Sequence, residues 1–519
     1  MKKRHQILIL ITLIFTFLLV YQPHFSYHWP LHVDEWHHIS EAIRLNHYGE
    51  YFEVLRSTSA IRFGGTEMGF HFFLFLLSWL FDLTWAYQFF PATWTVLSSL
   101  VLFYVVYKKT NKNFYLAWLS MIFFVSIRSN VNLTGLWFFT PLTFAIPFIF
   151  LYTYFFTEGI EKQNAKQLLI SLLIMVFLVP IHSISVLFAM PTFILYLIIN
   201  YKQAFKQYKI LISFLLIPII GILFYKYTLD IPWPGLIARL FDTLQFRYGW
   251  GVLEIHNSLT EVYHWTGYFL AAIGILVSLL SHNHRKYTLY LLWPATTFSL
   301  IVIYKLTGIS YLSPYQRNLY YFAISLPMLS AVGLYSLIRL FRINLRKIIL
   351  NKKETNLLDN FATVTISFKI KEEFKSIFEY FLSNIITFIL FIIILLLSFT
   401  NYYNLPSQVA LYHVIEQKHY DALKFIADFP PATVMAAPFV STAMYPITKK
   451  HEPVGAVVFY GNRQEVENFF LSEDCKTKKE ILNRNNAKYI MSPVTIDCNF
   501  NLIYTQPDNY IYEVKDVSK

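Results

Sequence analysis

Charged residues are scarce in this chain. Asp, Glu, Lys and Arg make up 14% of its 519 residues, against roughly 25% in an average soluble domain. Hydrophobic residues, by contrast, make up 56% and aromatic residues 19%. This balance excludes an ordinary soluble domain and is typical of an α-helical protein that crosses the membrane many times.

The chain also lacks the marks of nucleotide and nucleic-acid binding. Its net charge of +12 does not gather into a basic patch with interleaved aromatic residues in polar sequence, so no nucleic-acid partner is expected. In a membrane protein, basic residues mostly mark cytoplasmic loops. No glycine-rich phosphate loop follows the strand-like run before Gly461, so little supports a nucleotide site there. No internal repeat or low-complexity tract is present.

Cysteine is nearly absent. The two cysteines, Cys475 and Cys498, both lie in the polar C-terminal segment. If this segment faces an oxidising compartment, they could form one disulfide. Two unpaired thiols in a small domain fit the sequence equally well, so the sequence leaves the pairing open.

Long apolar runs dominate the first 400 residues, and runs of about 20 residues are candidate membrane spans. Clusters of Lys and Arg are expected at the cytoplasmic ends of spans. About eleven spans satisfy this rule, with twelve or thirteen as the alternative; they are 6–21, 85–107, 114–128, 133–156, 167–182, 184–201, 210–229, 265–281, 287–306, 318–338 and 380–400. The residues after Tyr21 lack a small-x-small cleavage site, which favours a retained first span over a cleaved signal. We therefore predict a multi-pass protein of the plasma membrane with a cytoplasmic N-terminus.

This orientation places four segments outside, namely 22–84, 230–264, 307–317 and 401–519. Residues 68–83 are apolar, but a run of about 16 residues is short for a span. If they were a span, every later basic cluster would lie on the outer side of the membrane instead of the cytoplasmic side. They are therefore predicted to lie in or dip into the outer interface. Helices resting on the membrane surface are predicted at 35–48 and 236–246, where apolar residues recur at helical spacing; packing under a loop is the alternative. The basic stretch 342–376 is predicted to be a cytoplasmic linker.

The composition and the hydrophobic periodicity of the sequence change from Leu405 onward. Short β-rich runs alternate there with helical patterns, which predicts an extracytoplasmic α/β domain over residues 401–519. Helices are expected at 407–427, 464–470 and 476–485, and strand-like runs at 432–438, 455–462, 487–493 and 502–514. The last run is expected to form a hairpin that turns at 506–509.

The stretch LHVDEWHHISEA follows the first span and places two adjacent carboxylates among histidines. Asp34 and Glu35 would lie on the outer side, where the edge of a low-dielectric site can raise the proton affinity of a carboxylate and suit it to act as a general base. His32, His37 and His38 could tune that base, donate hydrogen bonds or bind an ion. The alternative is an ordinary polar loop in which Asp34 caps the following helix.

A metal site in this loop is a weaker prediction. Asp34, Glu35 and His32 could hold a divalent cation such as Mg or Mn, but ligands on neighbouring residues rarely converge on one ion without help. The other long outer loop could supply a second acidic or metal-binding wall from Glu254, His256, Glu261 and His264.

The pattern H-x-D-E at 32–35, followed by a histidine and Glu41-Ala42, resembles the His-Pro-Asp-Glu signature of the GT-C glycosyltransferases. The resemblance is closest to the mannosyltransferases that use polyprenol-phosphate-mannose, although Val33 replaces the proline of that signature. More loosely, acidic residues in this loop also occur in protein O-mannosyltransferases, aminoarabinose transferases and the catalytic subunits of oligosaccharyltransferases. The bulky C-terminal segment is more similar to bacterial and archaeal members.

This resemblance implies a GT-C transmembrane catalytic domain over residues 1–400, with interfacial helices in the first outer loop, and a soluble domain over 401–519. It implies Asp34 as the catalytic base, with Glu35 supporting it or assisting an ion. It also implies a polyprenyl-phosphate-linked sugar as donor, so no nucleotide is needed outside.

A second candidate group stands in SPYQRN, at the mouth of the tenth predicted span. In the family that the chain resembles, an arginine here grips the phosphate of the lipid carrier, and the guanidinium of Arg317 matches phosphate oxygens. Tyr315 and Gln316 stand beside it, and His182 and His37 are further candidates for binding the donor. The alternatives are an arginine that snorkels to headgroups and a histidine that is simply hydrated.

The sequence therefore predicts a GT-C-type hexosyl- or pentosyltransferase, most readily an inverting one. Its acceptor would be a hydroxyl of a glycan, a lipid or a protein. A transporter or flippase of lipid-linked sugars is one alternative. Such a protein is expected to have charged or broken helices at mid-membrane and an inverted repeat. A non-catalytic scaffold with a binding domain is another, but it leaves the Asp34–Glu35 pair without a purpose.

Overall fold

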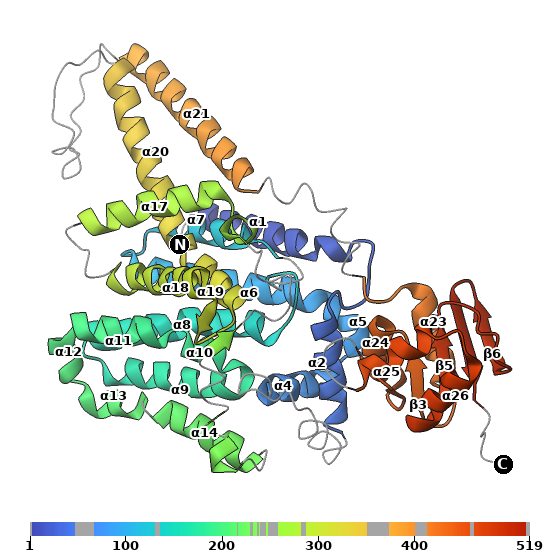
Figure 1. Cartoon of the computed structure of the whole chain (residues 1–519). Helices are drawn as coiled ribbons and strands as arrows, with labels where there is room; N and C mark the ends of the chain where they lie inside the picture. The colour runs from blue at the N-terminus through green and yellow to red at the C-terminus, as the bar shows by residue number, and fades with distance from the viewer. Residues whose placement is uncertain are drawn as a thin grey trace.

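The computed structural model of the chain describes residues 3–46, 67–129, 135–214, 216–228, 232–235, 238, 245–247, 258–281, 287–349, 373–399, 413–456 and 461–514. Within these ranges, long helices form a bundle, and a smaller body of helices and strands stands beside one end of it (Figure 1). We refer to these parts as the helical bundle (α1 to α21) and the C-terminal body (residues 413–456 and 461–514). The predicted fold class, a multi-span helical protein with a C-terminal α/β part, is confirmed.

The helices of the first part of the chain are α1 (Lys3–Tyr21), η1 (Gln22–His24), α2 (Val33–Arg44), α4 (Met68–Ser78), α5 (Leu83–Ala86), η2 (Tyr87–Phe89), α6 (Phe90–Lys109), α7 (Phe114–Val125), α8 (Pro141–Glu161), α9 (Ala165–His182), α10 (Ile184–Leu187), α11 (Met190–Ile199), α12 (Tyr201–Phe205), α13 (Tyr208–Phe214), α14 (Leu216–Thr228), α16 (Leu259–Val262), α17 (Trp265–Leu280), α18 (Thr288–Thr307), α19 (Tyr315–Ser325), α20 (Pro327–Ile349) and α21 (Glu373–Ser398). Two short strands, β1 (Gln245–Arg247) and β2 (Ile309–Tyr311), pair antiparallel.

Each predicted span overlaps one to three of these helices. Six helical segments in the described ranges are long and apolar enough to cross a membrane, and they are Lys3–His24, Leu83–Lys109, Pro141–Glu161, Ala165–His182, Thr288–Thr307 and Tyr315–Leu340. Shorter apolar helices are Met68–Ser78, Phe114–Val125, Ile184–Ile199, Trp265–Leu280 and Phe388–Ser398. The apolar segment predicted at 68–83 is therefore helical only as far as Ser78, and the exposed side chains of Trp79 and Leu80 follow it.

Several predicted boundaries are wrong. The span expected at 133–156 begins only at Pro141, because proline suits the first helical position and Thr143 Oγ1 accepts the Thr140 N–H at 2.8 Å. The helix expected at 236–246 does not reach its predicted end, because residues 245 and 246 lie in strand β1. Its other residues fall largely outside the described ranges.

The linker predicted at 342–376 is helical at both described ends. Helix α20 continues to Ile349 and α21 already begins at Glu373, while the residues between them lie outside the described part. Figure 1 shows these two helices as a long pair that projects from the bundle.

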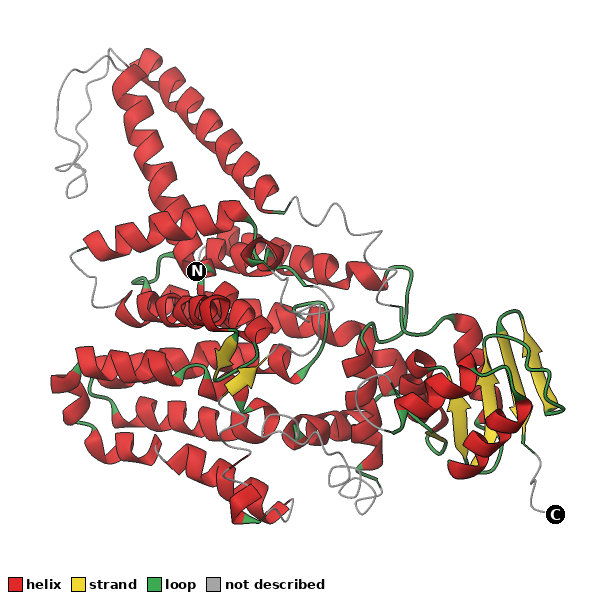
Figure 2. Cartoon of the chain, viewed as in Figure 1, coloured by secondary structure: helices red, strands yellow, loops and turns green. Residues whose placement is uncertain are grey.

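The C-terminal body is a three-layer α/β structure, whose strands Figure 2 shows in yellow. Its elements are α23 (Gln417–Ile426), β3 (Thr433–Ala436), α24 (Pro438–Thr448), β4 (Glu452–Pro453), α25 (Arg463–Leu471), α26 (Cys475–Arg484), β5 (Ala487–Ser492), β6 (Asn501–Gln506) and β7 (Asn509–Glu513). The strands lie in the order β4-β3-β5-β7-β6, with β3 parallel to β4 and β5, and β6 and β7 forming the predicted hairpin. Alternate side chains of β3 face opposite sides, so Val434 packs with α23 and α24 and Met435 packs with α25 and α26.

Two further features of this body concern the cysteine pairing and the strand expected at 455–462. Cys475 and Cys498 are joined in a disulfide, with their Cα atoms 5.3 Å apart. Of the strand expected at 455–462, residues 457–460 lie outside the described residues. In the described part, β4 ends at Pro453 and an isolated bridge joins Gly455 to Gly461.

Candidate active site

The acidic stretch of the first outer loop lies at the start of α2. The Asp34 N–H donates to His32 Nδ1 at 3.1 Å, and Glu35 Oε2 accepts the His32 N–H at 3.1 Å. This reciprocal capping box fixes where the helix begins. His32 is therefore the N-cap, and the alternative in which Asp34 caps the helix is wrong.

Glu35 is bound on all sides by backbone. It is 1% exposed, and it also accepts the Leu31 N–H at 2.8 Å and the Phe139 N–H at 2.7 Å. Phe139 lies two residues before the start of α8, so this carboxylate ties the first outer loop to the bundle. Its oxygens are occupied by structural hydrogen bonds, which leaves the neighbouring carboxylate as the one available for chemistry.

Asp34 is that carboxylate, and its side chain is 26% exposed with His32 Nδ1 3.5 Å from its Oδ1. Burial acts to raise the pKa of Asp34, but the charges of His32, His38 and Arg317 outweigh it and hold the pKa well below its usual range. The side chain is therefore ionised at neutral pH.

Arg317, from α19, lies within electrostatic range of this carboxylate although it is distant in sequence. Its charge lowers the pKa of Asp34 and also that of Glu67, which burial raises to about 8. The guanidinium therefore interacts electrostatically with two carboxylates of the first outer loop.

His182, at the end of α9, lies near one of these carboxylates. Its Nε2 lies 3.9 Å from Glu67 Oε1, and its Nδ1 lies 2.7 Å from Ser185 Oγ. The Tyr321 hydroxyl lies 3.0 Å from the same Ser185 oxygen. Because His182, Ser185 and Tyr321 are all buried, this hydrogen-bonded group fixes the imidazole with one nitrogen toward Glu67.

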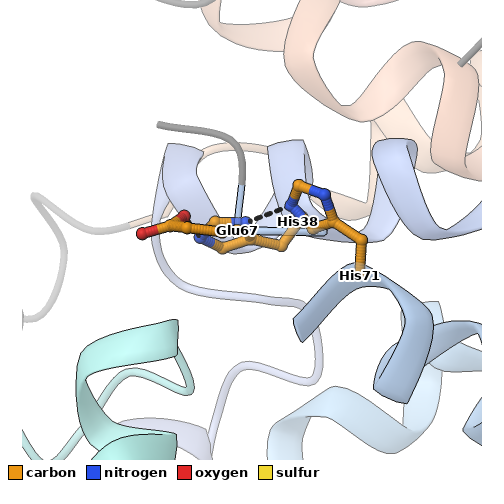
Figure 3. A group of neighbouring side chains, drawn as sticks. All are labelled: His38, Glu67 and His71. Carbon is orange, nitrogen blue, oxygen red and sulfur yellow. Dashed lines mark hydrogen bonds and ion pairs between the residues drawn. The ribbon is translucent and has the colours of Figure 1, made fainter. Parts of the chain in front are cut away.

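A group with metal-ligand chemistry adjoins these residues (Figure 3). One ligand atom from each of His38, Glu67 and His71 lies within 4.8 Å of the others. His38 Nδ1 and His71 Nε2 are 3.0 Å apart, and His38 Nε2 is 3.7 Å from Glu67 Oε2. This group contains none of Asp34, Glu35 and His32, the set predicted for a metal. Of its three members, the sequence analysis named only His38 as a residue that could bind an ion.

Sequence reasoning did not find Glu67 and His71. Glu67 is the N-cap of α4, with a left-handed backbone (φ 31°), and His71 lies in the first turn of the helix. The spacing of four residues between an acidic residue and a histidine is a metal-ligand spacing that the sequence does contain. The apolar surroundings of His71 were a second signal, because ionisable residues in such runs usually serve a function.

Three other predicted residues have different neighbours. His37 Nδ1 lies 4.0 Å from Glu41 Oε1, and its ring centroid is 6.2 Å from that of His71. Tyr315 packs on α18, stacked on the Tyr304 ring at 4.3 Å. Gln316 is 3% exposed, and its Oε1 has no hydrogen-bond partner among the residues that the structure describes.

The second acidic or metal-binding group, predicted in the outer loop 230–264, is only partly within the described residues. Glu261 closes a capping box with Ser258 at the start of α16, and His264 caps α17 by accepting the Thr266 N–H at 3.3 Å. These hydrogen bonds give both residues structural roles. Glu254 and His256 lie outside the described residues.

Comparison with known proteins places the chain by fold. No family profile and no curated protein matches the sequence. Among solved structures, ArnT from Cupriavidus metallidurans bound to undecaprenyl phosphate matches with a TM-score of 0.57 and 9% identity, over 99% of this chain and 98% of that one. The same ArnT in the apo state gives 0.54 and 12%, over 97% of both chains. The Archaeoglobus fulgidus oligosaccharyltransferase, in a complex with Zn and sulfate, gives 0.52 and 11%, over 97% of this chain and 73% of that one. The chain therefore has the GT-C fold.

Proposed function

We propose that this GT-C-fold chain is a membrane glycosyltransferase that moves a sugar from a polyprenyl-phosphate carrier to an acceptor hydroxyl at the outer face of the plasma membrane. In this proposal, residues 1–400 carry out catalysis, the N-terminus is cytoplasmic and residues 401–519 lie outside. The observation that carries it is the electrostatic interaction between Asp34 and Arg317, an ionised carboxylate within range of a guanidinium from a distant part of the chain. The undecaprenyl phosphate bound by a protein of the same fold supports the choice of carrier.

In the proposed reaction, Asp34 accepts the proton of the acceptor hydroxyl as its oxygen attacks the anomeric carbon. The bond between that carbon and the phosphate oxygen breaks, and the lipid phosphate leaves with the electron pair. Attack from the face opposite the phosphate inverts the anomeric configuration. Asp34 is suited to this role because Glu35, its neighbour, is held by three backbone N–H groups.

Arg317 is proposed to hold the donor phosphate. A guanidinium offers paired donors to phosphate oxygens, so it would stabilise the charge that develops on the leaving group. His182 is proposed to assist, since Ser185 holds its Nδ1 and leaves Nε2 toward the site.

A divalent cation would be held by His38, Glu67 and His71, and it would supply further positive charge near the leaving phosphate. Two imidazoles and one carboxylate suit Zn²⁺ better than Mg²⁺, which prefers oxygen ligands. We expect purified protein to take up Zn²⁺ at about one ion per chain, and H71A to lose it. H28N is the control, because His28 contacts Gln88 instead. Equal metal content in H71A and H28N would remove the cation from the proposal.

The direct test is mass spectrometry of cell-surface glycans and lipids from cells with and without the gene, followed by complementation with D34N. We expect a glycosylated species to disappear with the gene and to stay absent with D34N, because an amide cannot take the proton. D82N is the matched control: Asp82 caps α5 in the same outer loop, and asparagine caps equally well. Full restoration by D34N would favour the transporter or scaffold alternatives.

A further inference from the structure

We propose that the C-terminal body positions Asp34 by clamping helix α2, with Trp36 and Arg44 as the positioning residues. The proposal rests on the proposed function only for the role of Asp34. Helix α2 carries Asp34 in its first turn, and Figure 1 shows this helix between α4 and α24.

The first attachment is Trp36, two residues after Asp34. Its ring is 0% exposed and belongs to the hydrophobic core of the C-terminal body, together with side chains of α23, β3 and α24. The indole N–H donates to Pro30 O at 3.1 Å, which fixes the ring from the other side. A residue of the first outer loop thus completes the core of a body that begins almost 380 residues later along the chain.

The second attachment is Arg44, at the last turn of α2. Its Nη2 donates to Glu452 Oε2 at 2.5 Å, and its guanidinium lies 4.1 Å above the Tyr445 ring. Glu41 Oε1, on the same helix, lies 3.7 Å from Arg44 Nε. Arg44 is 3% exposed, whereas the Glu452 side chain is 39% exposed. Glu41 gives the guanidinium an acidic partner within α2, and the hydrogen-bonded ion pair with Glu452 links the end of α2 to β4.

The loop before α2 is attached as well. Tyr27 stacks on His413 with ring centroids 3.9 Å apart, and its hydroxyl accepts the Ile415 N–H at 3.3 Å. Trp29 stacks on Tyr420 at 4.2 Å. Attachments to the C-terminal body therefore occur both before and after Asp34, so the chain on each side of the carboxylate is held.

The opposite face of α2 packs on the bundle, where Ile39 and Ala42 contact Phe70 and Leu74 of α4. Arg317 stands on α19 and has no part in the clamp described above. Loosening the clamp should therefore move Asp34 relative to Arg317, which lowers the rate of the chemical step while the donor phosphate remains bound. Small displacements of a reacting group suffice for this, since about 1 Å can cost on the order of a hundredfold in rate.

The test compares E452Q with wild type by hydrogen–deuterium exchange and by transfer kinetics with the lipid-linked donor. E467Q is the matched control, because Glu467 accepts from Arg463 Nε at 2.6 Å within α25, away from α2. A second variant, W36F, keeps an aromatic ring but loses the bond to Pro30.

We expect the α2 amides of E452Q and W36F to exchange about tenfold faster, and kcat to fall about tenfold with little change in the KM for the donor. E467Q should match wild type in all three measurements. Unchanged exchange in α2 of E452Q would overturn the proposal, and so would a parallel loss of exchange protection throughout α23 to α26, which indicates general unfolding. If wild type transfers no sugar, the proposed function fails, and the exchange comparison alone still decides on the clamp.

Discussion

At the scale of residues, the sequence locates the acidic pair but does not tell which of the two carboxylates is available to act as the base. Asp34 and Glu35 are adjacent and chemically alike, so no pattern tells which one is free to act. The structure separates them through hydrogen bonds: backbone N–H groups occupy Glu35, and one of them comes from Phe139 at the start of a distant helix. Contacts of this kind depend on the folded bundle, so the sequence alone could not reveal them.

The role of Glu35 gives a stability prediction. E35Q replaces a carboxylate that accepts three backbone N–H groups by an amide with a single acceptor oxygen. We expect a loss of about 1–3 kcal/mol in the free energy of unfolding, visible as a lower midpoint in a thermal melt of the detergent-solubilised protein. D34N should melt like wild type. If E35Q melts normally yet is inactive, Glu35 takes part in the chemistry.

The depressed pKa of Asp34 gives a pH prediction. A base works only when ionised, and protonation of Asp34 requires a pH below its lowered pKa, so Asp34 should cause no loss of kcat/KM between pH 7 and about pH 5. H32N keeps a capping side chain but removes the charge that opposes burial, so the pKa of Asp34 should rise and the acid limb should move to higher pH. An unmoved limb, identical to that of H28N, would show that His32 does not tune this carboxylate.

At the scale of elements, apolar runs predict where the helices lie. The ends of helices and the breaks within them depend on single residues, such as a proline or a capping threonine, which hydrophobicity alone does not reveal. The sequence placed the spans well, yet it began one of them eight residues early, before the Thr140–Pro141 start of α8. The predicted span 318–338 lies within the single apolar helical segment Tyr315–Leu340, although within it α19 ends at Ser325 and α20 begins at Pro327. Proline at the first helical position is the signal in both cases.

The crossing of α17 and α20 depends on glycine. A Cβ on Gly274 would lie 1.9 Å from Leu329 O, and one on Gly333 would lie 1.9 Å from Leu270 O. Backbone meets backbone here, as in membrane helix pairs with small residues at the contact. We expect G274A to cost about 1–3 kcal/mol and to lower the thermal midpoint, while A272L, on the exposed face of α17, should not. Equal midpoints would mean that the two helices do not pack this closely.

At the scale of the whole molecule, the two parts can be predicted from the sequence, but the way in which they pack against each other cannot. The prediction of a membrane part and an α/β part needs only composition and periodicity. The packing of Trp36 into the core of the C-terminal body joins segments that lie far apart in sequence, and no local pattern carries that information. The exact division at residue 400 stays a prediction.

The disulfide provides a test of orientation. Cys475 and Cys498 are the only cysteines of the chain and are bonded to each other, which suits an oxidising compartment. We expect a membrane-impermeant maleimide to label intact cells only after reduction and denaturation of surface proteins. Labelling that needs cell lysis but no reduction would place the C-terminal body in the cytoplasm and contradict the proposed orientation.

The most direct measurement of the central idea follows donor binding and sugar transfer together in wild type, D34N and R317L. Because Arg317 is proposed to hold the phosphate and Asp34 to take the proton, R317L should bind undecaprenyl phosphate about 10- to 100-fold more weakly. D34N should bind it as wild type does while transferring sugar about 10²- to 10⁴-fold more slowly. Undiminished transfer by D34N, or equal lipid affinity in R317L and wild type, would contradict the shared site.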